Sequence, residues 1–256
     1  MLLCLVAALA SRPVAVMIHG AGGGGWEWEK WKPVFEKAGF DVVCPDLKPA
    51  KGGLAATKIE DYERQVISWC PKKRRVILIG ASMGGALAMR VASRVHPTQM
   101  ILVNAAPAQR RASKPHPAVI KWAGGPLKDT RDSMPDSDED TIMRAWPRWR
   151  DESGKVMDSL SAGYKIVDPK CPILMMLSKK DEEIPYSNSK VFLATLLMQC
   201  SYSPILMDYD EMSHVGPLLG KRAEEVADDA AVWLRTNRNR PHPVINSMST
   251  TSGRRG

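Results

Sequence analysis

A serine lies at the centre of a short motif that is flanked by glycines. Residues 80–84 read Gly-Ala-Ser-Met-Gly, so Ser82 is two residues from a glycine on either side. Residues 76–79 predict a buried strand, and residues 84–95 alternate small and apolar side chains at helical spacing. A serine at such a turn has a strained backbone and an exposed hydroxyl, and the amide of Met83 points toward whatever the hydroxyl attacks. The motif predicts a nucleophilic serine, although glycine and serine also occur in ordinary turns.

A run of glycines follows an earlier predicted strand. Residues 13–18 (Pro-Val-Ala-Val-Met-Ile) lead directly into His19 and a glycine-rich stretch, and we call residues 19–25 the glycine loop. Backbone this rich in glycine leaves amide groups uncovered, so they can hold an anion. A nucleotide phosphate loop would need Lys-Ser or Lys-Thr after the last glycine, where this chain has Trp26-Glu27. A dinucleotide-binding fingerprint fits poorly with a histidine at the end of the strand.

The two motifs, in this order, resemble the α/β-hydrolase family. The short segment ahead of the strand at residues 13–18 is similar to that of the compact branch of hydroxynitrile lyases and plant methylesterases. The resemblance extends over residues 13–236 and implies a mostly parallel central sheet that is flanked by helices. It also implies an oxyanion hole made by the amides of Met83 and Ala21, with Gly22 as the alternative to Ala21. His19 would then order the glycine loop and transfer no proton.

The resemblance further implies an acidic partner after a later strand. Residues 172–177 predict that strand, and three adjacent acids follow it shortly before an Ile-Pro pair. The spacing of the family selects Asp181 as the acid that orients the catalytic histidine. Glu182 and Glu183 are interpreted as solvated side chains.

One histidine is in the position that the family requires. His214 follows a predicted strand at residues 203–208 and precedes a predicted helix at residues 218–235. The sequence order Ser82, Asp181, His214 is the order of the family. The other histidines stand beside proline or in the glycine loop: His19, His96, His116 and His242.

The stretch at residues 107–168 differs in composition from the rest of the chain. It is rich in Pro, Asp, Arg and Trp, gives no strand signal, and predicts helices at residues 139–150 and 155–166. The α/β-hydrolase family carries a cap over the nucleophile at this place. We therefore predict a core of residues 1–106 and 169–236, a cap of residues 107–168, and a disordered basic tail at residues 237–256.

Tryptophans of the cap are candidates to line a substrate pocket. Trp146 and Trp149, together with Gly22 of the glycine loop, are the predicted substrate-binding residues. Three further side chains share this interpretation: Trp122, Met134 and Met143. The alternative for these apolar cap residues is a small satellite core under the cap.

Chain length, charge and cysteine content limit the partners and the location that we expect for this protein. The 256 residues suffice for one α/β domain, and about half of the net charge of +8 comes from four arginines after residue 237. We therefore predict no nucleic-acid partner, and no apolar run is long enough for membrane insertion. Five dispersed cysteines indicate reduced thiols and a cytoplasmic location. The apolar residues 1–10 leave a secretion signal as the alternative, and oligomeric state is not predicted.

These features together predict a serine esterase. Ser82 would attack a small-molecule ester, His214 would move the proton, and Asp181 would orient the imidazole, with neither metal nor organic cofactor. A serine at the turn argues against epoxide hydrolases and haloalkane dehalogenases, which use aspartate there. The alternatives are a hydroxynitrile lyase that acts with the same three residues, and a non-catalytic protein that binds a small ligand.

Overall fold

The computed structural model describes residues 11–111 and 114–237. The predictions for residues 1–10 and for the tail beyond Asn237 lie outside the described residues. Within the described ranges, no helix is both long and apolar enough to cross a bilayer. The cysteines at positions 44, 70, 171 and 200 are free thiols.

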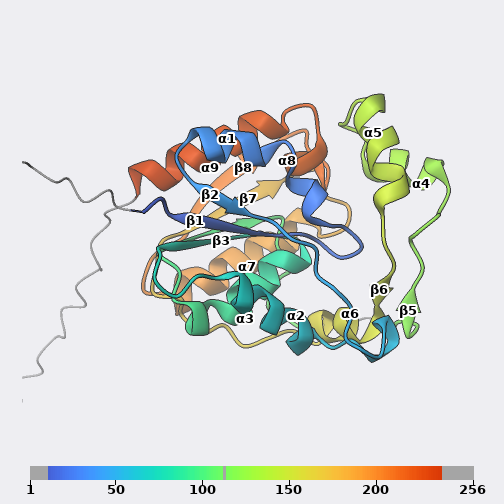
Figure 1. Cartoon of the computed structure of the whole chain (residues 1–256), viewed down its shortest axis with the longest axis horizontal. Coiled ribbons are helices and arrows are strands. Elements are labelled where there is room, and N and C mark those ends of the chain that lie inside the picture. Colours follow the sequence, from blue (N-terminus) through green and yellow to red (C-terminus); the bar gives the residue numbers. More distant parts are fainter. Residues whose placement is uncertain (1–10, 112–113, 238–256) are drawn as a thin grey trace, which may run out of the picture.

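A parallel sheet forms the centre of the molecule (Figure 1). Its strand order is β2-β1-β3-β4-β7-β8, and every neighbouring pair is parallel. The inner strands are continuous apolar runs because both of their faces are covered. The prediction of a mostly parallel sheet flanked by helices is confirmed. The strands are β1 (Val14–Ile18), β2 (Asp41–Val43), β3 (Val76–Ala81), β4 (Gln99–Val103), β7 (Ile173–Ser178) and β8 (Ile205–Tyr209).

Helices pack on both faces of the sheet, as Figure 1 shows. Successive residues of a strand point to opposite faces. Val16 of β1 therefore contributes to one hydrophobic cluster and Met17 to the other. One face carries α1 (Trp31–Lys37), α8 (Gly216–Leu219) and α9 (Ala223–Thr236). The other carries α2 (Ile59–Trp69), α3 (Met83–Val95), α6 (Gly154–Ser161) and α7 (Tyr186–Gln199).

Two predicted helices end earlier than their apolar pattern suggests. The helix predicted at residues 139–150 is α5 (Glu139–Ala145), followed by a 3₁₀ turn at Trp146–Arg148 that contains Pro147. The helix predicted at residues 155–166 is α6, which ends before Gly163. The φ of +80° at Gly163 is incompatible with continuing the helix.

The predicted helix at residues 218–235 is divided in two. The short α8 stops at Gly220, whose backbone is extended, and α9 begins three residues later. Glycine in that position ends a helix readily because it favours no single backbone conformation.

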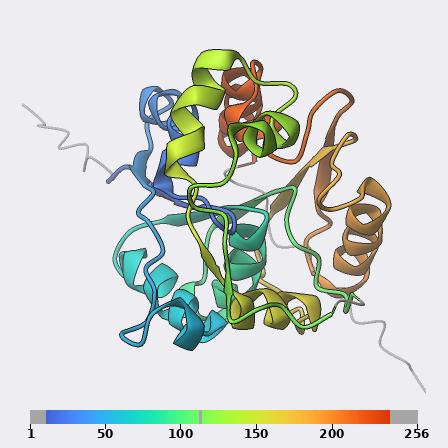
Figure 2. The same cartoon turned by 90° about the vertical axis from the view of Figure 1, so that its right-hand side faces the viewer.

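The cap segment projects beyond the carboxyl edge of the sheet (Figures 1 and 2). It contains α4 (Leu127–Ser133), α5 and two short antiparallel strands, β5 (Val119–Ile120) and β6 (Glu152–Ser153). Strands of two residues are too short to give a periodic signal. The last part of the predicted cap, α6, packs into the hydrophobic cluster on the α2 and α3 face of the sheet.

Candidate active site

Ser82 lies on a sharp turn between β3 and α3. Its backbone has φ +51° and ψ −119°, a conformation that non-glycine residues rarely adopt. A Cβ on Gly80 would lie 2.2 Å from the carbonyl oxygen of Gly84, and one on Gly84 would lie 2.1 Å from that of Ile18. Only glycine fits on either side of the turn, and the turn holds Ser82 at the carboxyl edge of the sheet.

Asp181 and His214 form a hydrogen-bonded pair. His214 Nδ1 and Asp181 Oδ2 are 2.8 Å apart, and the carboxyl side chain is only 1% exposed. The other oxygen, Asp181 Oδ1, accepts hydrogen bonds from the amides of Glu183 at 3.0 Å and Ile184 at 2.8 Å. These bonds fix the carboxylate so that Oδ2 faces the imidazole. Glu182 and Glu183 are exposed.

Asn104 brings the His214 loop to the edge of the sheet where Ser82 lies. Its Nδ2 donates to the carbonyl of His214 at 2.8 Å and to Ser178 Oγ at 2.9 Å, and its φ is +42°. One residue earlier, Val103 accepts a hydrogen bond from the Ser82 amide at 3.0 Å. The sequence predicts Asn104 as the end of the strand that precedes the cap, and not as a residue of the site. No hydrogen bond joins Ser82 Oγ to His214 within the described part of the chain, and such contacts often tighten only when substrate binds.

Carboxylates accept hydrogen bonds from three of the amides of the glycine loop. The amides donate in three places to acids from different segments: Gly20 to Glu27 at 3.0 Å, Gly22 to Glu152 at 3.3 Å, and Gly25 to Asp46 at 2.7 Å. The Ala21 amide has no partner among residues 11–111 and 114–237. The Met83 amide, in the first turn of α3, has no acceptor within the helix. Because the Gly22 amide already donates to Glu152 and the Ala21 amide does not donate within the described residues, Ala21 is favoured over Gly22 as an oxyanion donor.

A model of the α/β-hydrolase family matches residues 15–229. This match covers most of the chain. The chain belongs to the α/β-hydrolase family.

Curated relatives match a shorter part of this chain. Salicylic acid-binding protein 2 from Nicotiana tabacum is 37% identical over 79 residues, which are 27% of this chain and 30% of that protein. Polyneuridine aldehyde esterase from Rauvolfia serpentina is 31% identical over 94 residues, 33% of this chain and 34% of the relative. The chain therefore spans about a third of the length of the curated relatives that it matches. Plant methylesterases from Arabidopsis thaliana are also among the relatives.

Solved structures share the fold over nearly their full length. A crystal structure of polyneuridine aldehyde esterase aligns with a TM-score of 0.65 and 19% identity, and covers 88% of this chain and 99% of that one. The pyrethroid hydrolase PytH aligns with a TM-score of 0.68 and 18% identity, over 90% of this chain and 100% of that one. At these identities the likeness establishes the fold of the chain.

The cap segment is attached to the glycine loop by Arg150 and Glu152. The Arg150 amide donates to the carbonyl of Gly22 at 2.7 Å, and its Nε donates to that of Gly23 at 2.6 Å. Glu152, 3% exposed, accepts from the Gly22 amide and, at 2.8 Å, from the hydroxyl of Tyr62. Neither residue is predicted from the sequence, because charged side chains inside a polar segment give no motif.

His19 holds the glycine loop as a neutral side chain. Its Nδ1 is 2.7 Å from the carbonyl of Gly20, and its Nε2 accepts from the amide of Leu47 at 2.9 Å. Burial lowers the pKa of His19 to about 4, and the nearby guanidinium of Arg150 adds to that effect. The ring is therefore uncharged at neutral pH, and it joins Gly20 of the glycine loop to Leu47 of the segment after β2.

The cap tryptophans contact the cap itself and the glycine loop. Trp146 Nε1 donates to the carbonyl of Gly125 at 2.7 Å, and Trp149 packs edge-on against Trp26 at 4.9 Å between ring centroids. The ring of Trp122 covers Gly22, where it occupies the space that a Cβ would need. Contact of these residues with substrate stays a prediction. Of the two candidate methionines, Met134 is fully buried in a core cluster and Met143 is 44% exposed.

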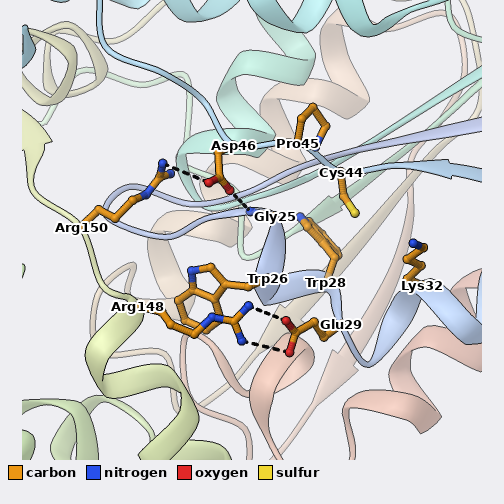
Figure 3. A pocket seen from close by; sticks show the side chains of 10 residues that line it. All are labelled: Gly25, Trp26, Trp28, Glu29, Lys32, Cys44, Pro45, Asp46, Arg148 and Arg150. Atoms are coloured by element: carbon orange, nitrogen blue, oxygen red, sulfur yellow. Dashed lines mark hydrogen bonds and ion pairs between the residues drawn. The ribbon is translucent and has the colours of Figure 1, made fainter.

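An open pocket of about 600 Å³ lies beside the far end of the glycine loop (Figure 3). The indoles of Trp26 and Trp28 form part of its wall, and two ion pairs cross it. The pairs are Arg148 with Glu29 and Arg150 with Asp46. None of the residues predicted as nucleophile, acid and base lines this pocket.

Glu27 makes the stability of the protein depend on pH. Its side chain is buried, and burial raises its pKa from 4.5 to about 7. The pKa of the folded state is higher than that of the unfolded chain, so the folded state binds more protons between these values. The contribution of Glu27 to stability is complete below pH 4.5 and is lost as the pH rises through about 7.

Glu27→Gln removes the titrating carboxyl group, so the stability of this variant should vary less with pH than that of the wild type. Relative to Glu27→Gln, the wild-type free energy of unfolding should fall by up to about 3 kcal/mol between pH 5 and pH 8. Urea denaturation of both proteins across that range measures the difference. The titration of His19 is common to both proteins and cancels. Parallel curves for the two proteins would contradict the prediction.

Proposed function

We propose that the chain is a serine hydrolase that cleaves carboxylic esters of small molecules through an acyl-serine intermediate. The observation that carries the proposal is the Asp181–His214 hydrogen bond of 2.8 Å, at the sheet edge where the turn exposes Ser82. The names of the relatives, which include methylesterases and an aldehyde esterase, point in the same direction.

The first step forms the acyl-serine. A free serine hydroxyl is too weakly acidic to attack an ester at neutral pH, so His214 Nε2 takes its proton as Ser82 Oγ bonds to the carbonyl carbon. Asp181 holds Nδ1 protonated, which leaves Nε2 free to act as the base, and it stabilises the imidazolium that forms. His214 then gives the proton to the departing alcohol. A water molecule then attacks the acyl-serine while His214 takes its proton, and return of that proton to Ser82 Oγ releases the acid.

The carbonyl oxygen becomes negative in each tetrahedral intermediate. In this proposal the amides of Ala21 and Met83 donate to it, since both lack a partner among the described residues. A donor that is fixed in place before the reaction lowers the barrier by about 3 kcal/mol. Both donors belong to rigid segments, because α3 fixes Met83 and the carboxylates described above hold the glycine loop.

Hydrolysis of an ester series tests the proposal. Methyl esters and p-nitrophenyl esters of increasing acyl length are incubated with the protein, and release of acid or nitrophenol is followed. We expect saturable hydrolysis, with an optimum acyl length that measures the pocket. An enzyme that hydrolyses no ester and is not labelled by a fluorophosphonate would refute the proposal. Cleavage of mandelonitrile without ester hydrolysis would favour a lyase instead.

A further inference from the structure

Glu27 directs a buried carboxyl group into the glycine loop. It belongs to a 3₁₀ turn, Gly25–Trp28, that directly follows the loop, and it is 4% exposed. Its Oε2 accepts the Gly20 amide at 3.0 Å. A Cβ on Gly23 would lie 2.2 to 2.6 Å from the three carboxyl atoms, so the carboxyl occupies the interior of the loop.

The carboxyl of Glu27 also lies close to the proposed reaction centre. A Cβ on Gly20 would be 3.4 Å from Ser82 Cβ and 3.9 Å from Glu27 Oε2, so the two side chains approach the same point on Gly20. The titratable and charged groups that act on Glu27 come from three other segments. They are His214 from the loop before α8, Arg150 from the cap, and Asp46 from the loop after β2.

We propose that Glu27 is a positioning residue of the oxyanion hole, which fixes the Gly20 amide and thereby the orientation of the Ala21 amide that follows it. This inference rests on the proposed ester hydrolysis. The carbonyl of Gly20 is fixed as well, by His19 Nδ1 at 2.7 Å and the Gly23 amide at 3.4 Å. Both the amide and the carbonyl of Gly20 therefore have hydrogen-bond partners, and these partners restrict the backbone conformations that a glycine could otherwise adopt.

The hydrogen bond, and not the charge, is the proposed contribution of Glu27. During the reaction His214 becomes positive and the carbonyl oxygen of the substrate becomes negative. An ionised Glu27 would stabilise the first and destabilise the second, so its effects on the barrier oppose one another. A neutral side chain of the same shape that accepts the Gly20 amide should therefore replace it.

Two substitutions separate these roles. Glu27→Met keeps the length of the side chain but removes the oxygen acceptor, and Glu27→Gln keeps an acceptor without the charge. We expect Glu27→Met to lower kcat by about 30-fold or more with KM changed less than about threefold, because the loss concerns the transition state. Glu27→Gln should stay within about fivefold of wild type. The matched control is Glu29→Gln, an exposed acid just after the same turn, which should leave kcat unchanged.

Labelling by a fluorophosphonate gives a second readout that needs no knowledge of the natural substrate. Its rate with Ser82 also depends on the oxyanion hole, so it should fall in Glu27→Met in parallel with kcat. Wild-type kcat in Glu27→Met, or equal losses in Glu27→Met and Glu27→Gln, would overturn the inference. If Glu27→Met fails to fold, a 30-fold loss of kcat in folded Glu27→Gln would by itself overturn the inference. A wild-type protein that neither labels nor hydrolyses esters would instead overturn the proposed function.

Discussion

Alanine in place of Ser82 is expected to abolish ester turnover. The change removes the oxygen that would form the acyl bond, and loss of a serine nucleophile of this type lowers kcat by about 10⁶-fold. Binding of substrate should persist, because the glycine loop and the cap are untouched. Initial rates on the best ester of the series, together with fluorophosphonate labelling of intact protein by mass spectrometry, measure the effect.

The fold should tolerate Ser82→Ala. Ser82 has a positive φ, and alanine meets the same backbone strain as serine, so the free energy of unfolding should change by less than about 1 kcal/mol. Ser187→Ala, an exposed serine at the start of α7, is the control and should react as wild type does. Labelling that survives in Ser82→Ala would place the nucleophile elsewhere.

Asparagine in place of Asp181 is expected to lower kcat by about 10⁴-fold. The amide oxygen can still accept from the amides of Glu183 and Ile184, so the loop should keep its shape. The amide nitrogen would face His214 Nδ1 and donate to it, which places the ring proton on Nε2. His214 could then no longer take the proton of Ser82. The pH dependence of kcat/KM, measured with the same ester, reports the loss.

The neighbouring acids provide the controls for Asp181. Glu182 and Glu183 are exposed, and their side chains make no bond to His214, so Glu182→Gln and Glu183→Gln should each stay within about twofold of wild type. A large loss in either variant, with Asp181→Asn active, would show that the family spacing selects the wrong acid.

Local sequence predicts the turn at Ser82 because some of its requirements are local. Gly80 and Gly84 lie two residues on either side of the serine, and a Cβ on Gly80 would collide with the backbone of Gly84, so the pattern itself carries this part of the geometry. The requirement at Gly84 is not local, because a Cβ there would collide with Ile18 of β1. The strands that lead to the glycine loop and to Asp181 are predicted for a similar reason. A strand covered on both faces must be apolar throughout.

The network around the glycine loop could not be predicted from local sequence. Gly22 and Glu152 are separated by 130 positions, and no short pattern shows that the two will meet. Glu27 stands next to the loop in sequence, yet its carboxyl turns back only because the glycines leave room for it. The groups proposed to react, together with Asp181 and His19, can therefore be predicted from the sequence, whereas Glu27, Arg150 and Glu152 cannot.

The attachment of the cap to the glycine loop restricts how this chain can acquire a new cap. Arg150 and Glu152 bond to Gly22 and Gly23, and Glu152 also bonds to Tyr62 of α2. A chimera that replaced the cap through residue 153 would leave buried loop amides and carbonyls without partners. A graft that ends before Arg150 would exchange the outer helices and leave the loop intact. Recombination within this fold should therefore favour breakpoints on the amino-terminal side of Arg150.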